Sequence, residues 1–219
     1  MDDLIRKRFD DLLQIPRLGA LYMNLKEIYR NAPVLAHGWD HIHRVMVNAL
    51  LIVDRQQKES EPNMEIVVPA VLLHDIGFLY NPDPYVHHLT GAEHCHIYLG
   101  LWNDSEIGLI EGCIRMHKGM MARFNTKPST LEERIVCDAD LLEKSGYIGL
   151  LQGLRTFVEF GEGKHPEYRS LYKIATHLMS LRDLEFFTSS GRDLANERGG
   201  LALRADVFKA AAQELEVYN

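Results

Sequence analysis

Apolar residues recur along this chain with the spacing of amphipathic helices. In residues 2–14, and again in residues 18–29, large apolar side chains return every three or four positions, which is the period of one helix face. We expect Pro16 to end the first helix and Pro33 to break the second. No segment alternates apolar and polar residues for long enough to predict a strand. The pattern therefore predicts an all-α fold.

Two further helices contain long apolar runs and are predicted to form the core. One covers residues 41–53, with Asp40 as its N-cap, and the other covers residues 64–77, where Pro69 either opens the regular part or kinks it. Gly77 is well placed to end the second helix in a left-handed conformation. One more helix is predicted at about residues 90–101, another begins at a cap on Asp104 or Ser105, and another begins at the capping box Thr130–Glu133. Further helices are predicted up to Phe160 and over residues 168–187 and 196–217.

The composition fits a globular protein and narrows the classes of function. Hydrophobic residues make up 46% of the chain and charged residues 25%, which is ordinary for such proteins. The formal net charge of −7 argues against general nucleic-acid binding, but a local metal could still hold a small phosphorylated substrate. Three cysteines, far apart and odd in number, indicate neither a disulfide framework nor a zinc knuckle. Because no signal peptide or membrane-spanning run is evident, we expect a cytoplasmic protein without membrane contact.

The histidines point to a chemical centre, because all of the eleven except His165 and His177 lie between residues 37 and 117. Among them, His74 and Asp75 stand side by side at the end of an apolar run. Burial without partners would cost about 2–7 kcal/mol for the neutral group and more for the charged one. A divalent cation removes that cost, since imidazole and carboxylate are both good ligands. The alternative is an ordinary helix end, in which Asp75 hydrogen-bonds His74 or a backbone amide.

Two other segments offer further ligands. His41 shares a helix face with Val45 and Ala49, so it is expected to point inward, although a satisfied core histidine has the same pattern. The helix after residue 130 carries Asp138 and Asp140. The collected donors are nitrogen and oxygen only, which suits iron, manganese, nickel, zinc or magnesium better than copper.

The order of these segments resembles the HD-domain superfamily of metal-dependent phosphohydrolases, and small stand-alone bacterial members in particular. The resemblance rests on the segments 41–45, 72–77 and 138–142, and it covers about residues 35–160. It implies an all-α, HD-type helical bundle in which His41, His74 and Asp75 bind a divalent metal. On this basis we expect one helical domain over residues 1–219, with an HD core at about 35–160 and flanking helices at 1–30 and 165–219.

The fourth ligand is ambiguous between Asp138 and Asp140. In the superfamily it is the Asp of an Ala-Asp pair, which here is Asp140. The apolar stripe of the helix instead contains Asp138 and puts Asp140 opposite it. We favour Asp140 as the ligand and keep Asp138 as a residue of the site.

Four more residues are expected around the metal. Some members of the superfamily hold a second metal through extra histidines, and His88 and His117 stand in the order that this requires. The number of metal ions, one or two, is therefore left open. The alternative is that both histidines lie beside the metal or contact phosphate. Arg44 and Lys118 are the nearest candidates for holding phosphate oxygens, against the alternatives of a surface salt bridge and a solvated loop. Phe78 stands where some relatives carry an acidic group that assists proton transfer.

Three functions agree with these residues. The first is hydrolysis of a phosphoester of a nucleotide or small phosphorylated metabolite by a metal-activated water. The second is an oxygenase with two iron ions, which a few members of the superfamily are. The third is a non-catalytic metal-binding sensory module, although no attached regulatory domain is seen in the sequence. The substrate and the oligomeric state cannot be read from the residues.

Overall fold

The chain folds into helices joined by loops. The computed structural model describes residues 3–56, 61–119, 127–161, 170–179 and 184–218, and no strand occurs among them, which confirms the all-α prediction. The α-helices in chain order are α1 (Asp3–Leu13), α2 (Pro16–Asn31), α3 (Trp39–Arg55), α4 (Met64–Leu73), α5 (His87–His94), α6 (Asp104–Met116), α7 (Leu131–Leu142), α8 (Gly146–Gly161), α9 (Leu171–Met179), α10 (Ser189–Glu197) and α11 (Gly200–Glu216). Two short 3₁₀-helices, η1 (Ile76–Leu79) and η2 (Cys95–Tyr98), follow α4 and α5.

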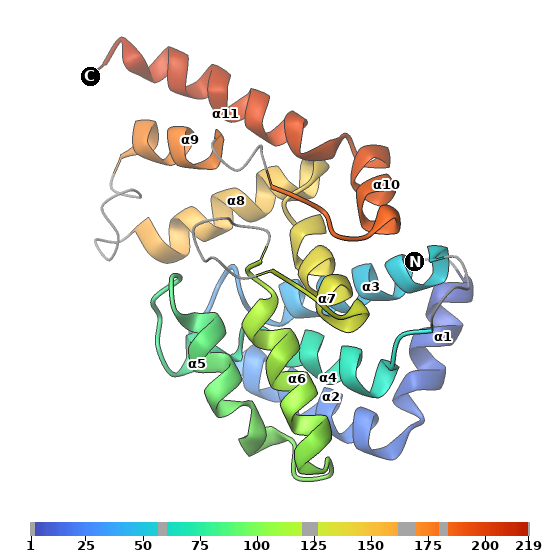
Figure 1. Cartoon of the computed structure of the whole chain (residues 1–219). Helices are drawn as coiled ribbons and strands as arrows, with labels where there is room; N and C mark the ends of the chain where they lie inside the picture. Colours follow the sequence, from blue (N-terminus) through green and yellow to red (C-terminus); the bar gives the residue numbers. More distant parts are fainter. Residues whose placement is uncertain (1–2, 57–60, 120–126, 162–169, 180–183, 219) are drawn as a thin grey trace.

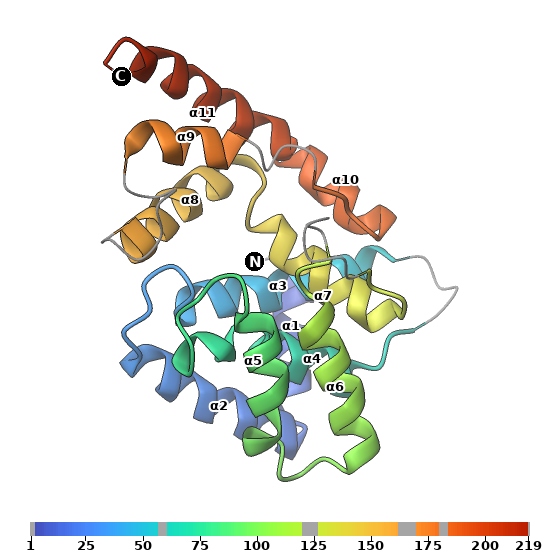
Figure 2. The ribbon, with the colours of Figure 1, turned by 60° about the vertical axis from the view of Figure 1, so that its left-hand side comes forward.

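The helices form two layers that are visible in Figures 1 and 2. In the larger layer α3 and α4 pack against each other and against α7, while α6 packs on α4, α5 and α7. In the smaller layer α11 packs along α8 and α9. The helix α10 joins the two layers, since it contacts α3, α7 and α11.

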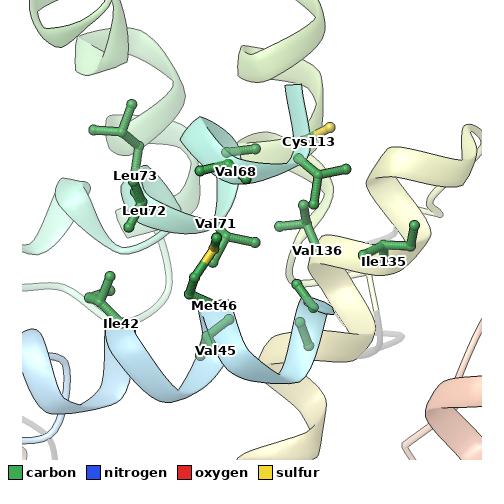
Figure 3. Close-up of a cluster of buried hydrophobic side chains, with 14 of the residues drawn as sticks. Ile42, Val45, Met46, Val68, Val71, Leu72, Leu73, Cys113, Ile135 and Val136 are labelled. Atoms are coloured by element: carbon green, nitrogen blue, oxygen red, sulfur yellow. The ribbon is translucent and has the colours of Figure 1, made fainter. Parts of the chain in front are cut away.

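The core of the larger layer is the meeting place of α3, α4 and α7 (Figure 3). Every residue of α4 from Ile66 to Leu73 is buried, which is the pattern of a helix surrounded on all sides rather than on one face. Truncation of one of these side chains, such as Leu72→Ala, is expected to cost about 2–5 kcal/mol of stability. This packing fixes the end of α4, and with it the position of His74 and Asp75.

A second apolar cluster connects the C-terminal helices to the end of α4. Phe78 of η1 packs there with Phe160 of α8, Leu178 of α9 and Phe208 of α11. Phe78, just beyond His74 and Asp75 in the chain, is therefore covered by the smaller layer.

Several predicted helix ends are wrong in detail. The residue Pro16 begins α2 instead of ending α1, which fits its fixed φ at the first helical position. Gly38, not Asp40, precedes α3, and the carboxylate of Asp40 instead binds Arg44 and Arg155. Gly77 is not left-handed; it is needed because a Cβ there would lie 1.9 Å from the carbonyl oxygen of His87.

Later boundaries also differ from the sequence pattern. The capping box of Thr130 and Glu133 is confirmed, whereas the cap of α6 is Asn103 rather than Asp104 or Ser105. The helix predicted for residues 90–101 begins earlier and changes to 3₁₀ geometry at Cys95. Residues 196–217 are broken at Gly199, whose φ of 96° ends one helix before the next begins.

Candidate metal centre

Ends and inner faces of five helices bring buried imidazole and carboxylate groups to one place. The contributing positions are the first turn of α3, the residues just after α4, the first residue of α5, the residue after α6 and the inner face of α7. These positions carry His41, His74 with Asp75, His87, His117 and Asp140. All six side chains are buried.

The first donor set consists of His41, His74 and one oxygen of Asp75. The Nε2 atoms of His41 and His74 lie 3.2 Å apart. Each of them is 3.2 Å from Oδ2 of Asp75. Three donor atoms at this mutual distance can hold one metal ion.

The second donor set uses the other oxygen of the same carboxylate. Oδ1 of Asp75 lies 3.3 Å from Nε2 of His87 and 3.7 Å from Nε2 of His117. The two imidazole nitrogens are 3.2 Å apart. Asp75 is thus shared between two sets of donors, one on each oxygen.

In three of these histidines a hydrogen bond at Nδ1 leaves Nε2, the nitrogen nearer Asp75, with a free lone pair. Nδ1 of His74 lies 2.7 Å from the carbonyl oxygen of Val71, and Nδ1 of His117 lies 2.6 Å from that of Ile114. Nδ1 of His87 is likewise 2.9 Å from a carbonyl oxygen, that of Pro84. A carbonyl oxygen can only accept, so in each ring Nδ1 carries the hydrogen and a neutral ring presents a bare Nε2 to Asp75.

The buried carboxylate of Asp75 tests whether cations fit here. No hydrogen bond satisfies either of its oxygens within the described part of the chain, although the residue is 1% exposed. Lone pairs of carboxylate and imidazole would face each other at about 3 Å, which is costly unless positive charge lies between them. The donor set therefore fits divalent metal ions, held by His41, His74 and Asp75 on one side and by Asp75, His87 and His117 on the other.

A family comparison agrees with this geometry. The HD domain model matches residues 38–145, which contain the two donor sets. The chain belongs to the HD-domain family. The family implies divalent metal binding, and the two donor sets are groups of this chain that could provide it.

Two individual proteins are similar to this HD chain. The Bacillus subtilis (strain 168) protein YpgQ, whose function is uncharacterised, is 25% identical over 169 residues, which are 77% of this chain and 80% of that protein. A crystal structure from an uncultured Thermotogales bacterium, described as a predicted HD superfamily hydrolase, has a TM-score of 0.60 and 21% identity. The match covers 96% of this chain and 99% of that one, and it shows the same fold.

Carboxylates surround the first donor set of the HD centre. Oδ1 of Asp140 lies 3.6 Å from Nε2 of His41, and Oε2 of Glu143 lies 3.5 Å from Nδ1 of the same ring. Burial alone would lower the pKa of His41, but the neighbouring carboxylates of Asp75 and Glu143 outweigh it and raise this pKa to about 9. In the metal-free protein His41 therefore holds an extra proton where a metal would otherwise lie.

The second donor set has the opposite electrostatic environment. Burial and the neighbouring charge of Lys118 lower the pKa of His87 to about 3, and the same two causes hold the pKa of His117 well below its usual value. Both rings are therefore neutral at ordinary pH, which is the form that binds metals.

Asp140, favoured from the sequence as the fourth ligand, lies beside the first set. Its Oδ2 is 2.9 Å from Nζ of Lys144 and 3.7 Å from Nζ of Lys118. Burial would raise the pKa of Asp140, but these two ammonium groups outweigh it and hold the pKa well below the usual value. An ionised carboxylate is thus available next to His41.

The structure places Asp138 away from the donor sets and gives it another role. Its oxygens accept hydrogen bonds from the backbone amides of Phe187 and Thr188, at 2.9 Å and 2.7 Å, and from the hydroxyl of Thr188. Thr188 is the N-cap of α10, so Asp138 fixes the start of that helix against α7. Burial raises the pKa of Asp138 to about 6. The predicted place of Asp138 in the site is corrected accordingly.

Arg44 is also engaged differently from the sequence prediction. Its guanidinium binds Asp40, Glu143 at 2.6 Å and Gln152 at 3.1 Å. Each of its three nitrogens donates one of these bonds, and through them Arg44 supports Glu143 behind His41.

His88 and Lys118 lie at the rim of the second donor set. The ring centroid of His88 is 5.8 Å from that of His87 and 6.2 Å from that of His117, so His88 is a neighbour and not one of the donors. Lys118 is largely buried, and its charge acts on both His87 and His117. It is a cation placed between Asp140 and the second set rather than a solvated loop residue.

Three residues of this region were missed in the sequence. His87 was passed over in favour of its neighbour His88, Glu143 lies just beyond the end of α7, and His37 precedes α3. The ring centroid of His37 is 5.8 Å from that of His41 and 6.5 Å from that of His87. The clustering of histidines was the signal for His37 and His87, but only contacts between distant segments place them here.

Within the described residues, no helix combines the length and apolar character that crossing a membrane requires.

Proposed function

We propose that this HD protein is a metal-dependent phosphohydrolase whose centre takes two divalent cations. The observation that supports it best is Asp75, which presents one oxygen to His41 and His74 and the other to His87 and His117. A carboxylate with one donor set on each side is suited to two neighbouring cations. The family membership favours hydrolase chemistry at such a centre.

Two cations held here would supply a deprotonated water as nucleophile and positive charge for the phosphate oxygens. The chain's own groups have separate tasks. Glu143 lies 3.5 Å from Nδ1 of His41 and so fixes the orientation of that ring, while Arg44 balances the charge of Glu143. Lys118 offers an ammonium group next to Asp140, where it could bind a phosphate oxygen as substrate enters.

The substrate proposed is a small phosphorylated molecule, a nucleotide or another phosphorylated metabolite. A net charge of −7 opposes the approach of any anion, and this favours a substrate small enough to be held by the buried centre alone. The same charge argues against general nucleic-acid binding. A cytoplasmic location remains a prediction.

A two-iron oxygenase is the second candidate, because the same histidines around one shared carboxylate could hold two iron ions. It predicts two irons per chain and oxygen consumption with a reduced substrate. The phosphohydrolase instead predicts phosphate release without oxygen.

The experiment is to purify the protein, load it separately with Mn²⁺, Fe²⁺, Ni²⁺, Zn²⁺ and Mg²⁺, and screen phosphorylated metabolites for phosphate release in air and under nitrogen. The Asp75→Asn variant serves as the negative control, and His96→Gln, an exposed histidine outside both sets, as the matched positive control. Anaerobic phosphate release that Asp75→Asn abolishes supports the proposal. Turnover only in air would select the oxygenase.

A further inference from the structure

A cavity of about 660 Å³ lies where α3, the turn from α7 to α8, and the end of α10 come together. Its volume is within the range of about 300–1,000 Å³ that is typical of small-molecule sites. Val47 and Ile148 provide apolar walls, and Tyr147, which is 74% exposed, stands beside Ile148 in the lining. The remaining lining includes a few charged and amide side chains, so the cavity has the mixed character of a ligand site.

The cavity is separate from the metal centre, and Glu143 stands between the two. Oε2 of Glu143 lies 3.5 Å from Nδ1 of His41, whereas Nε2 of that ring faces the first donor set. Because these two nitrogens lie on different sides of the imidazole, the cavity is behind His41 as seen from the metal donors. None of the donors of either set is among the described residues that line it.

The charges in the lining leave one cation without a counter-ion. Arg44 donates from Nε to Glu143 at 2.6 Å, and Arg55 pairs with Glu197 at 2.5 Å, so both carboxylates of the lining already have cationic partners. Arg198 differs from these arginines, because no carboxylate in the described part of the chain forms an ion pair with it. The lining thus carries one uncompensated positive charge.

Arg198 is held in a fixed position with hydrogen-bond donors to spare. Its Nη2 donates to Oδ1 of Asn48 at 2.9 Å. The amide nitrogen of Asn48 in turn donates to the carbonyl of Ala139 at 3.1 Å and to Oε1 of Glu143 at 3.2 Å, which prevents the amide from turning. A guanidinium has five N–H donors, and the others of Arg198 have no partner among the described residues. Such a group can bind a carboxylate through two parallel hydrogen bonds.

We propose that this cavity binds a small organic monoanion, with its carboxylate on Arg198 and its apolar body against Val47 and Ile148. The single surplus charge of the lining favours a monoanion over a neutral molecule or a dianion. The exposed ring of Tyr147 can pack on an aromatic body. This binding site goes beyond the proposed phosphohydrolase function and does not depend on it.

The test uses benzoate, which combines a carboxylate with a planar apolar body, and benzamide, its neutral isostere. Each is titrated into the metal-loaded wild type, and binding is followed by saturation-transfer NMR of the ligand. We expect benzamide to bind at least about 10-fold more weakly than benzoate, because it lacks the charge that the guanidinium recognises. Equal affinity for the two, or no binding of benzoate, would overturn the proposal.

Two variants locate the bound anion. Arg198→Gln removes the surplus charge, and we expect it to weaken benzoate binding by about 10-fold or more. Ile148→Glu leaves Arg198 in place and puts a carboxylate into the wall, so repulsion should weaken binding by a similar factor. Ile148 is 38% exposed, which makes a polar side chain tolerable there. Leu151→Glu is the matched control, because it adds the same charge at an exposed apolar position of α8 outside the described lining.

Metal content separates this cavity from the metals, which could also bind a carboxylate. All three variants should retain the wild-type amount of metal by elemental analysis, because none of them changes a donor. Weaker benzoate binding in Arg198→Gln and Ile148→Glu, with metal retained and Leu151→Glu unchanged, supports the proposal. Unchanged benzoate affinity in both cavity variants would place the anion elsewhere and overturn it. An equal loss in Leu151→Glu and Ile148→Glu would show a general effect of charge and overturn it as well.

Discussion

The two donor sets share one carboxylate, yet their surroundings differ. Around the first set, Asp140 and Glu143 lie within 3.6 Å of His41. Around the second set, the described neighbours of His87 and His117 include neutral His88 and the cation Lys118, and no described carboxylate other than Asp75 pairs with either ring. The first set thus adds negative charge to its metal and the second adds none beyond Asp75, so we expect the first to hold its ion more tightly.

The largest predicted effect is the loss of the first set. His74→Ala removes one of its three donors, so the metal bound at the first set should be lost and activity with it. The helical fold should persist, because α4 stays buried up to Leu73. Elemental analysis and circular dichroism measure the two properties. Full metal occupancy in this variant would contradict the proposed metal centre.

The next effect separates the two aspartates of α7. Asp140→Asn should lower metal affinity by about 10–100-fold, the range found for supporting groups of metal sites, because it removes charge beside His41. Asp138→Asn should retain the metal and instead lower stability by about 1–3 kcal/mol, since one hydrogen bond at the start of α10 is lost. Metal titration and denaturant unfolding of both variants test this pair, and the reverse assignment of the two losses would contradict it.

A smaller effect depends on pH and again distinguishes the sets. The pKa of His41 in the metal-free protein is about 9, above its unfolded value of about 6.5. The proton on His41 therefore stabilises the metal-free fold fully below pH 6.5, and this contribution is lost as pH rises to 9. A metal must displace that proton, so affinity at the first set should rise by about tenfold per pH unit between these values. Calorimetry in buffers of different ionisation enthalpy should find one proton released per first metal; none released would contradict this.

The smallest effect is expected at Arg44. Because Asp40, Glu143 and Gln152 already occupy its guanidinium, Arg44→Met should lower kcat/KM by no more than about tenfold while leaving the metal bound. The melting temperature should fall, since buried Glu143 loses a charged partner. A loss of activity as large as that of His74→Ala would instead indicate that Arg44 contacts the substrate directly.

Candidate ligands were predicted where segments of the chain resemble the HD-domain superfamily, and the prediction failed where helix phase was needed. His41, His74 and Asp75 were predicted from that resemblance, and the structure brings them together. Periodicity placed Asp138 on the apolar stripe and Asp140 opposite it, but α7 is buried at every position from Ile135 to Leu142, so that stripe does not mark a single core face.

His87 was missed for a related reason. The predicted helix began near residue 90, whereas α5 begins at His87. Without the correct start of the helix, the pattern could not show which of His87 and His88 faces the donor sets. The pairs of Glu143 with His41 and Glu159 with His37 join residues 102 and 122 positions apart, a distance that local patterns do not span.

The most direct test of the shared carboxylate is to locate the metals themselves. Crystals grown with excess Mn²⁺ and measured near the manganese absorption edge would give one anomalous peak per ion. We predict two peaks, one between His41, His74 and Asp75 and one between Asp75, His87 and His117, with the second weaker at low Mn²⁺ and absent in His117→Ala. A single peak at the first set, even at saturating Mn²⁺, would contradict the two-metal centre.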